Sequence, residues 1–262
     1  AEDGLKKAIA LPGPAAAVAR VKLALVHVEN GRTKMKAANT QQARDEAKHQ
    51  LDLGAQLLTQ VANRTADAPA ERDAQQQALF ELGKLLLQQQ NFPDAEARFR
   101  QLIQVNPAGP LANQSRLYLG SCLLLLARGD QSGRPPSDAE RKLADAQKLF
   151  EALAEVDDPF LRAQADIRLA NTTLLLKKYD DMPALCEKLA ARYKGKVEEL
   201  IVLSMLYSSN RFADRTADAA RTLAKMEEVY GKLTDADFPG GADEYTREYW
   251  KKQWFDLLKG MK

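Results

Sequence analysis

The chain has 262 residues, enough for one large or two small domains with a buried core. Its formal charge is +2, which is too balanced to indicate nucleic acid or an anionic membrane as a partner. Strong helix formers dominate, aromatic residues make up only 6% and β-branched residues are sparse, so we predict an all-α protein. No apolar run approaches the ~20 residues that a membrane-spanning helix needs.

The first part of the chain, residues 1–70, predicts a leading helical hairpin. Apolar residues recur at helical spacing over residues 14–35 and again over residues 41–64. The two stretches are separated near residues 38–40. We therefore expect two long helices ahead of the more strongly patterned part of the chain.

The stretch FELGKLLLQQQNFPDAEARFRQLIQVNP, residues 80–107, predicts a helix, the turn QNFPDA and a second helix. Pro93 falls where the first turn of a helix tolerates proline, and Asn106-Pro107 is a natural stop. Gly83 lies inside the first helix, where glycine costs about 1 kcal/mol relative to alanine, so its presence needs a compensating reason. The expected inner faces are Leu79, Leu82, Gly83 and Leu86, then Ala95, Phe99 and Leu102.

The same pattern returns three times downstream, each time with a small residue at the place of Gly83. These small residues are Gly120, Ala170 and Ser204. A polar insertion near residues 127–142 separates the two helices of the second unit. The other inner residues expected in these units are Leu119, Leu123, Ala146, Phe150 and Leu153; Leu169, Met182, Cys186 and Leu189; and Leu200, Leu203, Tyr207, Ala220 and Leu223.

This pattern resembles the tetratricopeptide repeat. The resemblance implies a right-handed α-solenoid of antiparallel helix hairpins, with four repeats over residues 71–231 in one continuous domain. In that family the small residue lets the two helices of a hairpin approach closely, which would explain Gly83. The link after the first unit adds three residues to the 34-residue period, a spacing similar to that of bacterial cell-envelope members of the family. We therefore expect a periplasmic or envelope location, with the cytoplasm as the alternative.

The two ends of the chain leave further alternatives open. The sequence begins Ala1-Glu2-Asp3, which fits a mature secreted protein or a segment of a longer one. After a break at DFPGGADE, residues 232–262 are expected to end in a helix that contains Trp250, Trp254, Leu257 and Leu258. This helix either caps the repeat array, whose last hairpin would otherwise expose an apolar face, or contacts a membrane surface or a partner.

The resemblance also implies a concave groove lined by the first helix of each repeat. A partner helix or an extended peptide could place apolar anchors in such a groove. Alternatively, several of the apolar candidates form the core between adjacent repeats. The residues with which family members grip chaperone C-termini are absent, except for Arg168. The candidate partner-binding residues are Phe80, Lys84, Leu117, Tyr118, Leu124, Ile167, Arg168, Asn171, Leu174, Ile201 and Met205.

The sequence shows no pattern for catalysis, for a metal or for a cofactor. His27 and His49 have no nucleophile or metal-ligand constellation near them, and nucleotide-binding glycine loops are absent. Cys122 and Cys186 belong to no C-x-x-C pair, so we expect two buried thiols rather than a disulfide. We predict a non-catalytic scaffold or adaptor for another protein. The alternative is a structural subunit of a large assembly, held by its outer surface and its termini.

Overall fold

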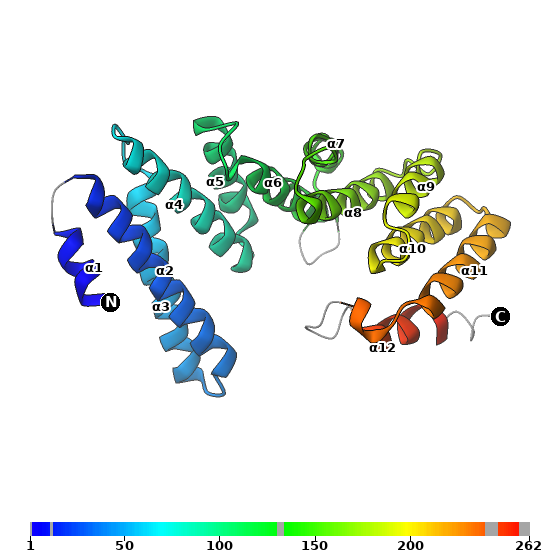
Figure 1. The fold of residues 1–262 in the computed structure, drawn as a ribbon, viewed down its shortest axis with the longest axis horizontal. Helices are drawn as coiled ribbons and strands as arrows, with labels where there is room; N and C mark the ends of the chain where they lie inside the picture. Colours follow the sequence, from blue (N-terminus) through cyan, green and yellow to red (C-terminus); the bar gives the residue numbers. More distant parts are fainter. Residues whose placement is uncertain (1, 11–12, 130–133, 239–245, 257–262) are drawn as a thin grey trace. The chain divides into compact units, whose positions relative to one another are not determined.

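The computed structural model describes residues 2–10, 13–129, 134–238 and 246–256, and within these ranges all regular structure is helical (Figure 1). The prediction of an all-α protein is thereby confirmed. The chain forms two compact units, Ala1–Ala139 and Glu140–Lys262. No helix in the described ranges is both long and apolar enough to cross a membrane.

The first unit consists of six helices that pack against their neighbours in chain order. The predicted leading hairpin is present as α2 and α3, and Thr40 caps α3 by accepting a hydrogen bond from the Ala43 N–H at 3.2 Å. A short helix ahead of this hairpin, α1, was not predicted, and it packs against α2. The bounds are α1 (Glu2–Ile9), α2 (Pro14–Ala37), α3 (Gln41–Ala62), α4 (Pro69–Gln88), α5 (Phe92–Val105) and α6 (Ala112–Ala127).

Glycines allow α2 and α3 to cross closely. A Cβ atom added to Gly54 would lie 2.6 Å from Cγ2 of Val28 and 3.0 Å from the carbonyl oxygen of Ala24. A Cβ atom on Gly31 would lie 2.7 Å from the side chain of Leu51. Real Cβ contacts are longer than this, so both positions need glycine at the observed helix separation. In the leading hairpin, as expected for Gly83, glycine therefore allows two helices to approach closely.

Gly83 itself lies against the ring of Phe99. A Cβ atom at Gly83 would lie 2.8 Å from two ring carbons of Phe99, which is fully buried. The close approach of α4 and α5 thus accounts for a glycine inside a helix. The predicted inner face is confirmed, since Leu79, Leu82, Ala95, Phe99 and Leu102 are all buried, while Leu86 is half-buried.

The second unit contains five further helices, α7 to α11, and a C-terminal segment. Within it, α8 packs against α9 and α10, and α10 also packs against α9 and α11. The predicted inner residues Phe150, Met182, Cys186 and Leu200 are 0% exposed. The bounds are α7 (Ala139–Leu153), α8 (Pro159–Leu175), α9 (Met182–Arg192), α10 (Val197–Phe212), α11 (Thr216–Lys232), the 3-10 turn η1 (Asp235–Asp237), α12 (Arg247–Trp250) and the π-helical turn η3 (Lys251–Asp256).

Three helices that open a predicted hairpin, α4, α8 and α10, end in the same local structure. The residues Gln90, Lys177 and Asp214 have positive φ angles of 61°, 58° and 57°. In each case the next N–H donates to the carbonyl five residues earlier, which is the Schellman ending of a helix. These bonds are Asn91 to Leu86 at 2.9 Å, Lys178 to Thr173 at 3.1 Å and Arg215 to Asn210 at 2.8 Å. A repeated helix ending supports a repeated hairpin.

The fourth predicted unit departs from the 34-residue pattern. Lys177 follows the small residue Ala170 by seven residues, but Asp214 follows Ser204 by ten, so α10 continues for three more residues. The inner face of α11 is displaced accordingly. The prediction that Ala220 lies on it was wrong, because Ala220 is exposed, whereas Ala219, Thr222, Met226 and Val229 are buried.

The C-terminal segment packs against α10 and α11. Trp250 and Phe255 are 4% and 5% exposed and share a core with Leu203, Tyr207 and Met226. This burial favours the predicted cap over a free amphipathic helix. The predicted Leu257 and Leu258, most of the break at DFPGGADE and residues 130–133 of the insertion lie outside the described residues.

Candidate functional site

In the first unit, three of the five predicted partner-binding residues belong to the core. Phe80, Leu117 and Leu124 are 5%, 8% and 6% exposed. Lys84 and Tyr118 are half-buried beside them, with the Lys84 ammonium 5.1 Å from the centre of the Phe80 ring and the rings of Phe80 and Tyr118 5.7 Å apart. The five side chains offer little surface to a partner. This agrees with the alternative interpretation, in which several of the apolar candidates form the core between adjacent repeats.

In the second unit, all six predicted residues are partly exposed. They lie on α8 and α10, which pack against each other. Each helix has one stripe of four partly exposed residues. Successive residues of the stripe are three, four and three positions apart, a spacing that keeps their side chains on one helical face. The stripes are Gln164, Ile167, Asn171 and Leu174 on α8, with Arg168 beside them, and Glu198, Ile201, Met205 and Ser208 on α10.

Three of the four apolar residues of these stripes pack against a hydrophobic core. Leu174 and Met205 pack against the core that contains Ala170 and Met182, and Ile201 packs against the core that contains Leu200. Their bases are therefore fixed while part of each side chain faces outward. The Arg168 guanidinium is also held in place, since its Nη1 donates to the Gln164 carbonyl at 3.0 Å and to Gln164 Oε1 at 2.6 Å. We call these stripes the α8–α10 surface.

A cleft of about 370 Å³ lies at the N-terminal end of the α8–α10 surface. Gln164 and Glu198, the first residues of the two stripes, both line it. The other lining residues come from the start of α8, the end of α9 and the link to α10. They are Pro159, Phe160, Arg162, Ala163, Arg192, Tyr193 and Lys196.

A buried carboxylate binds two of the residues that line this cleft. Asp166 is 1% exposed and accepts hydrogen bonds from Arg192 Nη1 at 2.7 Å and from the Tyr193 hydroxyl at 2.6 Å. The hydrogen bond that Arg192 donates to Asp166 raises the pKa of Arg192. Burial, followed by the hydrogen bond to Asp166, raises the pKa of Tyr193. This network was not predicted from the sequence, although an Asp on the apolar face between Ala163 and Ala170 is a signal for it.

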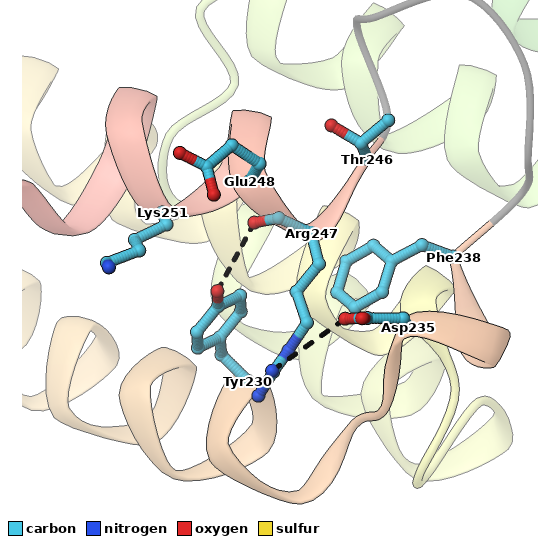
Figure 2. Close-up of a pocket in the computed structure, with 7 residues that line it drawn as sticks. All are labelled: Tyr230, Asp235, Phe238, Thr246, Arg247, Glu248 and Lys251. Atoms are coloured by element: carbon cyan, nitrogen blue, oxygen red, sulfur yellow. Dashed lines mark hydrogen bonds and ion pairs between the residues drawn. The ribbon is translucent and has the colours of Figure 1, made fainter.

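A second cavity, of about 490 Å³, lies beside the C-terminal segment (Figure 2). Figure 2 shows the Arg247 side chain beside Tyr230 and Asp235, with its guanidinium 4.9 Å from the centre of the Tyr230 ring and 3.8 Å from Asp235 Oδ1. The Tyr230 hydroxyl donates to the Arg247 carbonyl at 3.2 Å. The charges of the other two charged lining residues, Glu248 and Lys251, are opposite and also sum to zero. The balanced charge gives no preference for an ionic ligand.

The described residues hold no cluster of three or more His, Cys, Asp and Glu side chains that could bind a metal ion. Nδ1 of His27 donates a hydrogen bond to Gln50 Oε1 at 2.9 Å, and His49 is exposed. Cys122 and Cys186 are free and fully buried, as predicted. Burial raises the pKa of both thiols from 9.0 to about 12, with a smaller contribution from Glu96 at Cys122.

These raised pKa values predict a loss of stability in alkali. A thiol whose pKa is higher in the folded state than in the unfolded state makes its full contribution to the free energy of unfolding below pH 9. It loses this contribution as the pH rises towards 12. At pH 10.5 we expect each thiol to cost about 2 kcal/mol of unfolding free energy. Denaturant unfolding at pH 7 and pH 10.5, followed by the tryptophan fluorescence of the second unit, should therefore show a smaller pH difference for Cys186→Ala than for wild type. An unchanged difference would contradict the prediction.

Comparison with known proteins does not identify a family for the chain. No protein-family model matches it, and no curated protein is similar enough to count as a match.

Proposed function

We propose that the chain is a non-catalytic adaptor that binds a peptide or a short helix of another protein on the α8–α10 surface. The proposal includes the architecture that the sequence pattern indicates, a right-handed solenoid similar to tetratricopeptide repeats. One observation carries it: all six candidate residues of the second unit are partly exposed, whereas most neighbouring positions on the same two helices are buried.

The chemistry of this surface suits a protein ligand. Ile167, Leu174, Ile201 and Met205 supply apolar contact, and a methionine adapts its shape to different partners. Asn171 and Arg168 add polar groups that can fix the register of a bound chain. Because Leu174, Ile201 and Met205 are anchored in the core, they lose little conformational entropy on binding. A location in the cell envelope rests on the spacing of the first repeat link and remains a prediction.

A site-specific crosslink tests this proposal. A photoreactive benzoylphenylalanine is placed at Met205 and, in a matched protein, at Lys188, which is exposed on α9. Both proteins are illuminated in extract from the source organism, and the captured partner is identified by mass spectrometry and purified. The proposal expects capture from Met205 and not from Lys188.

Binding of the purified partner is then measured by calorimetry. Asn171→Arg and Met205→Lys should each weaken binding by about tenfold or more, and Lys188→Glu by less than about twofold. Circular dichroism checks that the variants are folded. Equal binding by all variants would reject the α8–α10 surface and favour the alternative of a structural subunit held by its outer surface.

A further inference from the structure

The cleft at the N-terminal end of the α8–α10 surface is lined by two cations, Arg162 and Lys196, that form no ion pair with any described residue. The Nε and Nη2 atoms of Arg162 donate to the Val156 carbonyl, at 2.9 Å for Nε, and this neutral acceptor fixes the guanidinium without cancelling its charge. Lys196 makes no ion pair or hydrogen bond through its side chain with any residue that the structure describes. Both residues line the cleft.

The other charges of the cleft leave it positive. Arg192 is neutralised by the buried Asp166 at 2.7 Å, and the outlying Glu155 carboxylate lies 3.8 Å from Arg192 and is 78% exposed. Glu198 is the one acid among the residues that line the cleft. Arg162 and Lys196 therefore outweigh it. A group with a negative charge would be attracted here, and a guanidinium held in a fixed orientation favours carboxylate oxygens in particular.

An exposed aromatic side chain forms the outer wall. Phe160 is 74% exposed, which is unusual for a phenylalanine, and it stands next to Pro159 at the start of α8. A lone exposed apolar side chain carries no meaning by itself. Here it borders a concave, positively charged space, so one ligand could contact the ring and the cations together.

The cleft is continuous with the α8–α10 surface. Gln164 lines the cleft and precedes Ile167 on α8 by three residues, and Glu198 lines the cleft and precedes Ile201 on α10 by three residues. Residues three apart lie on the same helical face. A peptide bound to the two stripes would therefore have one of its ends at the cleft.

From this geometry we infer that the segment bound by the α8–α10 surface is acidic at one end: a side-chain carboxylate enters the cleft between Arg162 and Lys196, and an adjacent apolar side chain packs on Phe160. This inference rests on the proposed function and names the chemistry of the partner. The occupant is a peptide segment of another protein with at least one Asp or Glu beside an apolar residue. The apolar stripes hold the remainder of the segment.

A random 12-residue peptide library displayed on phage provides the probe. The library is selected on immobilised wild-type protein and, in parallel, on the charge-reversed variant Arg162→Glu/Lys196→Glu. Selection on wild type should enrich peptides with an Asp or Glu next to an apolar residue, and the variant should lose this preference. A matched variant, Lys188→Glu/Lys225→Glu, changes the net charge equally at exposed positions outside the cleft and should enrich the same peptides as wild type.

The most enriched peptide is then synthesised, and its affinity is measured by fluorescence anisotropy at two salt concentrations. Lys196→Glu alone, which breaks no side-chain hydrogen bond or ion pair among the described residues, should weaken binding by about tenfold and reduce its salt dependence. Phe160→Ser should weaken binding by about threefold to tenfold. Tryptophan fluorescence confirms that each variant is folded.

The possible outcomes separate the inference from the proposed function. Enriched peptides that require Asn171 and Met205 but carry no acid, and that bind equally to Lys196→Glu, would overturn the inference and leave the proposed function standing. Failure of the selection to enrich any peptide that requires Asn171 or Met205 would overturn both.

Discussion

Replacing Phe99 with alanine is expected to lower the free energy of unfolding of the first unit by about 3 to 5 kcal/mol. Phe99 is fully buried, and its ring stacks on Tyr118 at 5.4 Å and meets the edge of Phe80 at 6.2 Å. Alanine would leave a cavity at the point where Gly83 lets α4 and α5 approach. Val105→Ala, on the same helix but 44% exposed, should cost less than about 0.5 kcal/mol and serves as the control.

A double-mutant cycle tests whether close packing is the reason for the glycine. Gly83→Ala gains up to about 1 kcal/mol of helix propensity, but its new methyl group meets the Phe99 ring, so we expect a net loss in the wild-type background. In a Phe99→Leu background, part of the ring volume is gone, and the same Gly83→Ala change should be neutral or stabilising. The difference between the effects of Gly83→Ala in the two backgrounds directly measures the coupling between residues 83 and 99.

Hydrogen exchange measured by mass spectrometry suits these variants, because Trp250 and Trp254 are in the second unit and report on that unit alone. Exchange of peptides from α4, α5 and α6 gives the opening free energy of the first unit. If Phe99→Ala changes it by less than about 1 kcal/mol, the ring is not the centre of this core. If Gly83→Ala is equally unfavourable in both backgrounds, Phe99 is not what the glycine accommodates.

The sequence predicted the inner faces of the helices well because they follow from simple periodicity. In each helix the apolar residues of the inner face recur every three or four residues. Leu79, Phe99, Phe150 and Met182 are examples from four helices, and all are buried. Small residues at one recurring position gave the phase of each hairpin. Helical periodicity and a glycine that contradicts its own propensity are local signals, and a single sequence contains them.

Other features depend on contacts that no local pattern specifies. The extra three residues of α10 displace the inner face of α11, and only the position of Asp214 in the folded chain reveals this change. Gly31 and Gly54 lie in different helices, so their close contacts arise only when α2 meets α3. The sequence also could not decide whether groove positions are core or surface. Phe80 and Met205 were both predicted to line the groove. In the structure Phe80 lies in the core, whereas Met205 is partly exposed.

Removing the buried carboxylate of Asp166 is the second change with a large expected effect. Asp166→Ala should lower the free energy of unfolding of the second unit by about 2 to 4 kcal/mol. The variant leaves the buried Tyr193 hydroxyl without its acceptor and Arg192 without its nearer counter-charge, since Glu155 remains at 3.8 Å. The cost should be below that of a fully buried ion pair, because the Arg192 side chain is 25% exposed and can turn to water.

Tyr193→Phe provides the matched comparison, since it removes one hydrogen bond and keeps the ion pair. It should cost about 1 kcal/mol. Urea unfolding followed by tryptophan fluorescence is suitable, because α10 contributes Val202 to the core around Ala170 and Leu203 to the core around Trp250. A loss of only about 1 kcal/mol for Asp166→Ala would mean that water replaces the network at little cost.

Asp166→Asn separates the structural role of this network from the proposed binding role of the cleft above it. The amide retains an acceptor for Tyr193, but it no longer neutralises Arg192, which keeps only the exposed Glu155 at 3.8 Å as a counter-charge, so stability should fall while the cleft becomes more positive. An acidic peptide selected on wild type should then bind more tightly to this less stable variant, and more so at low salt. Unchanged or weaker binding would indicate that the charge of Arg192 does not reach the ligand, and that the network supports only the packing of α8 against α9.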